Sequence, residues 1–255
     1  MDAVAIIPAR MGSSRFPGKP LADILGLPMI EHVRRRVSMS KVVSEVYVAT
    51  CDKEIHDAVT DLGGKAIMTS SEHQRASDRT AEAAESLNSE LIVMVQGDEP
   101  MTYPNMVDLA LQPMVEDSSI ICTNLMKRII DYDDFLNPNT IKVVTDLQSN
   151  AIYMSRSPIP YLSDQTNLFS EPKYKQVCII PFTRDSLKLY TQLEPTPLEI
   201  AESIDMNRFM EHGYKVKMIQ SEHDSHAVDD IEDLALVTEL MKKDPLTLSY
   251  INPSS

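Results

Sequence analysis

The sequence predicts an α/β fold with a mostly parallel central sheet and helices on both faces. Strand patterns and helix patterns alternate through the first hundred residues, a rhythm typical of βαβ units. The segments Ala3–Ile7 and Leu91–Val95 are continuously apolar, as expected for strands that are buried on both faces. Turn residues mark the helix ends, for example Gly63-Gly64 after the helix expected at Lys53–Leu62.

The remaining elements follow in chain order. In the first half we expect further strands at Glu45–Thr50 and Lys65–Met68, and further helices at Pro28–Val37 and Asp78–Leu87. The second half is less regular. There we expect helices at Tyr103–Val115, Pro197–His212 and Asp229–Lys242, a polar loop at Ser163–Lys173, and strands at Ser119–Met126, Ile141–Thr145, Ala151–Met154, Gln176–Phe182 and Lys215–Ile219.

No shift in composition marks a linker between domains. We therefore expect one domain over residues 1–243, with an inserted dimerisation or lid segment around residues 128–195. Residues 244–255 read as a loosely held C-terminal tail. A chain of 255 residues is long enough to bury the core of such a domain.

The composition argues against several classes of partner. Asp and Glu number 38 against 24 Lys and Arg, and the formal net charge of −14 disfavours nucleic acid or an anionic membrane as the main partner. Arg34-Arg35-Arg36 and the N-terminal loop from Arg10 to Lys19 still form a local basic region. No apolar stretch approaches the length of a membrane span, and no signal peptide is recognisable. Three widely spaced cysteines favour buried thiols, so we expect a cytoplasmic protein.

A cluster of small and basic residues follows the first strand. The loop from Arg10 to Lys19 contains Gly12, Ser13, Ser14, Arg15 and Gly18. Backbone amides and cations at the end of a parallel strand can surround a polyphosphate. The loop is neither a Walker motif nor a Gly-x-Gly-x-x-Gly fingerprint. A surface turn with scattered basic residues is the alternative, but the position of the whole cluster favours an anion site.

Acidic residues end another buried strand. Gln96-Gly97-Asp98-Glu99-Pro100 follows Leu91–Val95, which places Asp98 at the carboxyl edge of the sheet with the basic loop. A carboxylate facing a polyphosphate suits Mg²⁺, although a turn with Asp98 as a helix cap is the alternative. A second acidic group, Asp229 to Asp233, opens the last predicted helix. Asp230, Glu232 and Asp233 are typical of a helix N-terminus, whereas the sequence leaves the role of Asp229 open.

Several blocks of sequence resemble a known family. They include Ile-Ile-Pro-Ala-Arg-Met-Gly-Ser-Ser-Arg-Phe-Pro-Gly-Lys-Pro-Leu at residues 6–21 and Val-Gln-Gly-Asp-Glu-Pro-Met at residues 95–101. These are similar to the signature of the sugar-acid cytidylyltransferases, and closer to the 3-deoxy-manno-octulosonate (KDO) branch than to the sialic-acid branch because Pro-Leu follows Lys19. The resemblance extends to about residue 242. It implies a Rossmann-like nucleotidyltransferase fold, an Mg²⁺ cofactor and a homodimer.

The resemblance also implies an activity and a set of site residues. CMP would pass from CTP to the anomeric hydroxyl of a 2-keto-3-deoxy sugar acid, and pyrophosphate would leave. Carried over by position, Arg10, Arg15 and Lys19 would hold the triphosphate, with Asp98 completing the catalytic set. Asp98 and Asp229 would bind Mg²⁺. The other nucleotide contacts would be Pro8, Ala9, Gly12, Ser13, His73, Gln74 and Arg79, and the sugar acid would lie near Gln96, Arg156, Gln176, Glu199 and Asp205.

The chain departs from the family pattern on the acceptor side. Where the family carries Arg-His-Leu-Gly-Ile-Tyr, this chain has Lys175 to Ile180, so that Gln176 and Ile180 replace a histidine and a tyrosine. Two hypotheses follow: a modified or different ulosonic acid is the acceptor, or compensating residues still bind KDO. Two other functions stay open. One is nucleotidyl transfer from a different nucleotide to a sugar- or alditol-phosphate, and the other is a catalytically silent nucleotide-binding relative.

Overall fold

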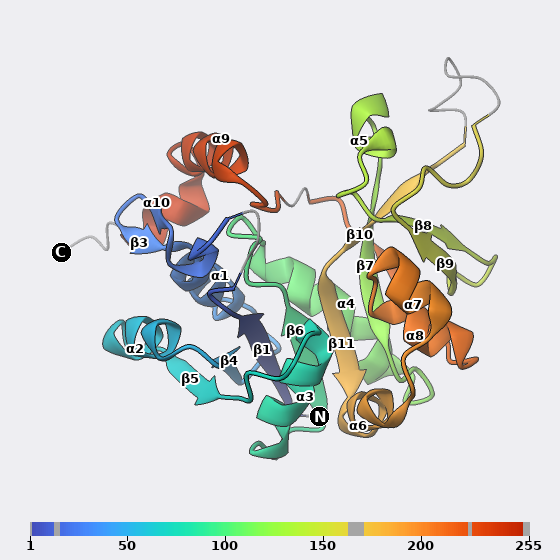
Figure 1. Ribbon diagram of the computed structural model, residues 1–255, viewed down its shortest axis with the longest axis horizontal. Helices are drawn as coiled ribbons and strands as arrows, with labels where there is room; N and C mark the ends of the chain where they lie inside the picture. Colours follow the sequence, from blue (N-terminus) through green and yellow to red (C-terminus); the bar gives the residue numbers. More distant parts are fainter. Residues whose placement is uncertain (1, 13–15, 163–170, 224–225, 252–255) are drawn as a thin grey trace. The chain divides into compact units, whose positions relative to one another are not determined.

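The computed structural model describes residues 2–12, 16–162, 171–223 and 226–251 (Figure 1). The chain divides into two compact units: unit 1 combines Met1–Asp108 with Ser225–Ser255, and unit 2 is Leu109–Asp224. The first boundary falls inside helix α4 (Pro104–Glu116), so the described chain passes from unit 1 into unit 2 there without a linker. The single domain with a dimerisation or lid segment around residues 128–195 stays a prediction.

Parallel strands form the sheet of unit 1. β1 (Ala3–Ala9) lies between β6 (Leu91–Val95) and β4 (Glu45–Thr50), and β5 (Lys65–Met68) lies beyond β4. Every residue of β1 and β6 is buried, which explains why both segments are apolar without alternation. The parallel sheet expected from the first hundred residues is therefore confirmed.

Helices connect these strands. α1 (Met29–Val37) links β1 to β4, α2 (Lys53–Asp61) links β4 to β5, and α3 (Ala76–Glu85) links β5 to β6. Because such crossovers are right-handed, α1 and α2 cover one face of the sheet and α3 covers the other. The direction of chain progression reverses between β1 and β6. Ligands of open α/β sheets bind at that point, beyond the carboxyl ends of the strands.

The end of the chain returns to unit 1 as two helices, α9 (Ile231–Met241) and α10 (Pro245–Ile251), both drawn in red in Figure 1. Residues 245–251 thus form a helix where the sequence suggested a loosely held tail. Asp244 accepts a hydrogen bond from the Thr247 N–H at 2.9 Å, and Pro245 opens the helix. An aspartate followed by proline is a helix-start signal that sequence analysis had missed.

Unit 2 has a mainly antiparallel sheet. Its strand order is β12-β7-β10-β8-β9, in which only the β12–β7 pair is parallel. The strands are β7 (Thr123–Arg128), β8 (Lys142–Thr145), β9 (Ala151–Ser155), β10 (Tyr174–Val177) and β12 (Lys217–Gln220). Short apolar segments predicted these strands, but such segments do not indicate whether neighbouring strands run parallel or antiparallel.

Several elements of unit 2 differ from the predicted ones. The apolar run at 176–182 is divided between β10 and β11 (Ile179–Thr183). The helix expected at 197–212 is broken into α7 (Pro197–Glu202) and α8 (Met206–Glu211), because Ser203 adopts a left-handed conformation with φ 55°. Two further helices, α5 (Tyr132–Leu136) and α6 (Arg184–Gln192), begin at the side-chain caps Asp131 and Thr183.

The three cysteines are free thiols. Cys122 is fully buried, and burial raises the pKa of its thiol. Cys51 and Cys178 are half-buried, so the prediction of buried thiols is confirmed for Cys122 alone. No helix in the described part of the chain is long and apolar enough to cross a membrane.

Candidate active site

A cavity of about 370 Å³ lies in unit 1 at the carboxyl ends of β1 and β6. Each predicted site residue of unit 1 that the structure describes lines it: Pro8, Ala9, Arg10, Gly12, Lys19, His73, Gln74, Arg79, Gln96, Asp98 and Asp229. The sequence did not single out Arg75 and Met29, which also line the cavity. Ser13 and Arg15, predicted to bind the nucleotide, lie outside the described residues.

The two strand ends approach each other closely at Gly97. A Cβ atom there would lie 3.1 Å from the Pro8 carbonyl oxygen and 2.9 Å from Cδ1 of Ile30. Only glycine fits against the backbone of β1 without displacing it. Gly97 thereby brings the next residue, Asp98, to the same edge of the sheet as the basic loop.

Lys19 joins two acidic segments that are far apart in the sequence. Its ammonium group donates to Oδ2 of Asp98 at 2.9 Å and to the Val228 carbonyl at 2.8 Å. Oδ1 of Asp229 lies 3.8 Å from the same nitrogen. One cation therefore lies within ion-pair distance of both carboxylates.

The basic loop is held at its base by backbone contacts. Gly18, with φ 74°, donates its N–H to the Met11 carbonyl at 3.2 Å. The Met11 N–H donates to Oδ2 of Asp52 at 2.7 Å. These contacts fix the point where the chain leaves β1, and a short 3₁₀ turn at Lys19–Leu21 then directs Lys19 into the cavity.

A loop after β5 carries His73 and Gln74 to the cavity. Nε2 of His73 contacts Oε2 of Glu82, which also accepts the Ser70 N–H at 2.9 Å. Burial opposes ionisation of Glu82, but these hydrogen bonds outweigh it and lower the pKa of its carboxyl. Buried Arg79 donates to the Ser70 carbonyl at 3.2 Å. Arg79 and Glu82, a residue that the sequence had not singled out, thus fix this loop.

The acidic residues from Asp229 to Asp233 have two different roles. Asp230 accepts the N–H groups of Glu232 and Asp233, and the Asp233 side chain accepts the Asp230 N–H in return. This capping box confirms the prediction of helix-terminal acids. Asp229 instead lies at the cavity beside Lys19.

The basic region expected at Arg34-Arg35-Arg36 is neutralised within unit 1. Arg34 and Arg35 both form ion pairs with the buried carboxylate of Glu31. Arg36 is fully buried and pairs with Asp244. The charge of this local basic region is thus offset, because Glu31 on the same helix and Asp244, the residue before α10, pair with the guanidinium groups.

In unit 2, a carboxylate that the sequence analysis missed organises Arg156. Glu202 accepts the hydroxyls of Tyr153 and Ser155, each at 2.6 Å, and the Arg156 N–H at 2.8 Å. Burial opposes its ionisation, but these bonds lower the pKa of the Glu202 carboxyl. The Arg156 side chain donates to the carbonyls of Glu202 and Pro138 at 2.7 and 3.0 Å.

Lys142 shapes the same part of unit 2. Its buried ammonium donates to the carbonyls of Asn137, at 2.8 Å, and Thr140. Burial, with a smaller contribution from the nearby charge of Arg156, lowers the pKa of Lys142 to about 8. Lys142 therefore fixes the turn whose Pro138 carbonyl receives Arg156.

Three further residues predicted near the sugar acid have protein partners. Glu199 is fully buried and forms two hydrogen bonds with Arg208, at 2.6 and 2.7 Å. Nε2 of Gln176 donates to Oδ1 of Asn124 at 2.6 Å. Asp205 precedes α8 and is half-buried, and its backbone carbonyl accepts the Arg208 N–H at 3.1 Å. Contact of these residues with an acceptor stays a prediction.

The cavity residues suit a magnesium–nucleotide complex. In the part of the chain that the structure describes, no group of three or more His, Cys, Asp and Glu side chains could hold a metal ion alone. Mg²⁺ prefers one or two carboxylates together with phosphate oxygens and waters. The pair Asp98 and Asp229 fits this donor set, because a single ammonium already reaches both carboxylates.

Comparison with known proteins identifies a matching family and several similar enzymes. The family described as Cytidylyltransferase matches residues 4–221. A 3-deoxy-manno-octulosonate cytidylyltransferase of Geotalea uraniireducens is 46% identical over 95% of this chain and 100% of its own length. The enzyme of the same name from Geobacter sulfurreducens is 43% identical, with the same coverage.

A solved structure described as CMP:2-keto-3-deoxy-manno-octonic acid synthetase complexed with CTP gives a TM-score of 0.88. It is 38% identical, and the match covers 95% of this chain and 99% of that one. The fold is therefore the Rossmann-like nucleotidyltransferase fold that the sequence predicted. Family, relatives and structure agree over nearly the whole chain, and the protein is a member of the cytidylyltransferase family.

Proposed function

We propose that this enzyme transfers CMP from CTP to the anomeric hydroxyl of 3-deoxy-manno-octulosonate (KDO) and releases pyrophosphate. One observation carries the proposal. In this member of the cytidylyltransferase family, Lys19, Asp98 and Asp229 lie together beyond the carboxyl ends of β1 and β6, where the chain progression of the parallel sheet reverses. The sugar-acid class comes from the relatives named above, whose matches cover 95% of this chain.

The reaction forms one bond and breaks another at the α-phosphorus of CTP. The anomeric oxygen of the sugar acid attacks and loses its hydroxyl proton to water, the bond to the β-phosphate oxygen breaks, and pyrophosphate carries the electron pair away. Such transfers depend on alignment and charge neutralisation more than on a covalent catalyst. Lys19 and Arg10, both at the cavity, supply positive charge for the triphosphate and the leaving pyrophosphate.

Asp98 and Asp229 would hold Mg²⁺ with the triphosphate. When bound, Mg²⁺ neutralises phosphate charge and makes the attacking hydroxyl easier to deprotonate. Lys19 would then exchange its carboxylate partners for phosphate oxygens, so that its ammonium stays paired. His73, held by Glu82, and Gln74 also line the cavity and would offer polar groups to the cytosine.

Arg156 supplies a guanidinium for the acceptor carboxylate. Glu202 and the Pro138 carbonyl fix its orientation, so less side-chain entropy is lost on binding. Gln176 and Ile180, which replace a histidine and a tyrosine of the family pattern, keep a modified ulosonic acid as the second candidate acceptor. Ile180 is buried and offers no side-chain hydrogen bond.

Pyrophosphate release tests the function. The purified protein is assayed with Mg²⁺ and each of CTP, UTP, GTP and ATP, against KDO, its 8-amino analogue and sialic acids. We expect release with CTP and KDO. Release with CTP and one other sugar acid would keep the reaction and change the acceptor, whereas release with another nucleotide and a sugar phosphate would overturn the proposal.

We further propose that the enzyme works as a homodimer in the cytoplasm. Mass measurement in solution tests the assembly, with two chains per particle as the expected result. Fractionation of cells that produce the protein tests the compartment. A monomer in solution would refute the dimer without affecting the proposed reaction.

A further inference from the structure

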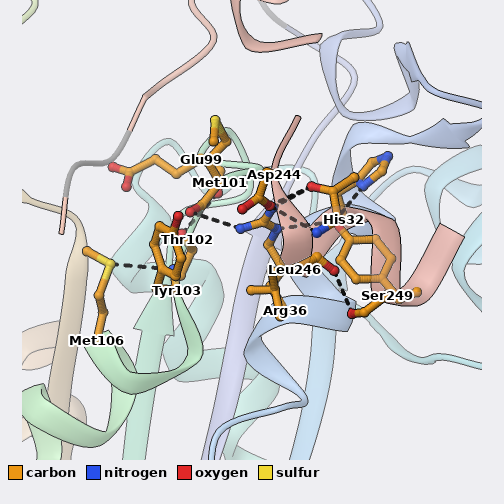
Figure 2. A network of polar contacts seen from close by, with 12 residues as sticks. His32, Arg36, Glu99, Met101, Thr102, Tyr103, Met106, Asp244, Leu246 and Ser249 are labelled. Carbon is orange, nitrogen blue, oxygen red and sulfur yellow. Dashed lines mark hydrogen bonds and ion pairs between the residues drawn. The ribbon is translucent and has the colours of Figure 1, made fainter. Parts of the chain in front are cut away.

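One buried arginine ties the turn after Asp98 to the C-terminal helix (Figure 2). Arg36 of α1 is fully buried, and its Nη1 donates to the Met101 carbonyl at 3.2 Å. Its Nη2 donates to Oγ1 of Thr247 at 2.6 Å and pairs with Asp244. Figure 2 shows the guanidinium between the 99–103 turn and α10, with bonds to both. A single side chain therefore connects these two segments.

The turn itself is held by successive carbonyl groups. The Asp98 carbonyl accepts the Val228 N–H at 2.9 Å. The Glu99 carbonyl accepts both the N–H and the hydroxyl of Thr102, at 3.1 and 2.9 Å. The Met101 carbonyl accepts Arg36. Hydrogen bonds of one short turn therefore link the Met101 carbonyl, which Arg36 holds, to the backbone at Asp98.

A relay of hydrogen bonds fixes the other edge of the guanidinium. Nε of Arg36 donates to the Tyr250 hydroxyl at 3.1 Å, which also contacts Nδ1 of His32 at 2.8 Å. Nε2 of His32 faces the Ile24 carbonyl at 2.7 Å, so Nε2 must carry the proton and Nδ1 must accept from Tyr250. Burial lowers the pKa of His32, which agrees with this neutral tautomer.

Apolar contacts link the same segments. Met101 and Val228 belong to one buried cluster with Val237 and Met241 of α9. The two chain segments that carry Asp98 and Asp229 therefore share a core, and α9 and α10 belong to the chain end that completes it. Burial of this kind leaves little freedom for independent movement of the two carboxylates.

We propose that Arg36 is a positioning residue for the metal-binding carboxylates: through the Met101 carbonyl and α10, it holds the turn that sets the place of Asp98 against Asp229. The role rests on the proposed function, in which these two carboxylates hold Mg²⁺. It requires the planar fork of arginine, because one side chain must reach the Met101 carbonyl, Thr247, Asp244 and Tyr250 at once. Lysine retains the charge but cannot span this set of partners.

Two variants test the role. Arg36→Lys removes the fork, and Thr247→Val removes the hydroxyl that accepts from Arg36 while keeping the side-chain shape. Arg34→Lys is the matched control, since Arg34 lies on the same helix and contacts Glu31 instead. Binding of Mn²⁺, used in place of Mg²⁺, is measured by electron paramagnetic resonance with CTP and no acceptor, below the thermal midpoint of each variant.

We expect Arg36→Lys and Thr247→Val to raise the dissociation constant for Mn²⁺ by about 10-fold, as groups that orient metal ligands do. Arg34→Lys should keep the constant of the unaltered protein. Turnover of the first two variants should recover at high metal concentration, which a general loss of folding would not allow. If Arg36→Lys fails to fold, Thr247→Val decides.

A lowered thermal midpoint with an unchanged Mn²⁺ constant in the folded variants would make Arg36 a purely structural residue and overturn the inference. Failure of the unaltered protein to bind Mn²⁺ with CTP would overturn it as well. If Mn²⁺ and CTP bind but no acceptor supports pyrophosphate release, the proposed function fails while the positioning role of Arg36 is still measured by Mn²⁺ affinity.

Discussion

The two units differ in how their predicted site residues are arranged. In unit 1, residues from four separate segments line one cavity, and Lys19 reaches both Asp98 and Asp229. In unit 2, Glu199 is enclosed in a buried ion pair, and Arg156 is oriented by backbone carbonyls. The difference shows that site residues at the ends of parallel strands can be predicted to lie close together, because the sheet itself brings those ends to one edge. For residues on antiparallel strands and at helix ends, the sequence does not indicate whether they lie close together.

The largest effect is expected for a variant that disrupts the cavity of unit 1. Lys19→Ala should lower kcat/KM for CTP by about 10³-fold, the upper range for removal of one charge-stabilising donor. The fold should survive, because the lysine lies on a short turn at the cavity. Steady-state pyrophosphate release and thermal unfolding are the measurements. Lys53→Ala, at an exposed lysine of α2, is the control and should be neutral. Full activity of Lys19→Ala would remove Lys19 from the triphosphate site.

The second prediction tests whether the buried ion pair of Arg208 and Glu199 in unit 2 is structural. Arg208→Met should lower the free energy of unfolding by about 3 kcal/mol, because it leaves the Glu199 carboxylate buried without its partner. Urea unfolding measures this. Lys188→Met, at an exposed residue of α6, is the control. Unchanged stability combined with a raised KM for the acceptor would instead make Glu199 a substrate contact.

Asp98→Asn tests the metal carboxylates at nearly constant shape. Turnover should fall by about 100-fold, and half-saturation should move to higher Mg²⁺, because a neutral amide binds a hard cation more weakly than a carboxylate does. A magnesium titration of activity provides the measurement. Asp57→Asn, at a half-buried position of α2 outside the cavity, is the matched control. A magnesium titration that superimposes on that of the unaltered protein would exclude Asp98 as a ligand.

The smallest effect concerns Lys142. Its pKa is lowered to about 8 in the folded protein from an ordinary value of 10.5. Between these values the unfolded chain binds more protons, so the stability of the protein relative to Lys142→Met should rise with pH. Below about pH 8 both states are protonated, and the folded state bears the full cost of the buried charge. Urea unfolding of both proteins between about pH 7 and pH 10 measures the difference; parallel curves would contradict the lowered pKa.

Sequence reasoning succeeded where a local signal and a global rule agree. Apolar runs located β1 and β6, and the end of each buried strand located Lys19 and Asp98. It failed where a tertiary contact decides. Arg36 reads as part of a basic run, and only the folded chain shows its partners on α10. Likewise, nothing near Glu82 or Glu202 in the sequence indicates that they hold His73 and Arg156. The break at Ser203 depends on a backbone conformation that helical periodicity does not encode.

Unit 1 is assembled from opposite ends of the chain, which bears on its biosynthesis. Lys19 and Asp98 precede all of unit 2, whereas Asp229 and α10 follow it. Because a ribosome releases the N-terminal part first, the strands β1 to β6 emerge long before the second carboxylate and the partners of Arg36. A chain that terminates within unit 2 carries the parallel strands without Asp229, the second carboxylate of the proposed Mg²⁺ site. Asp229 is therefore added to unit 1 only after unit 2 has been synthesised.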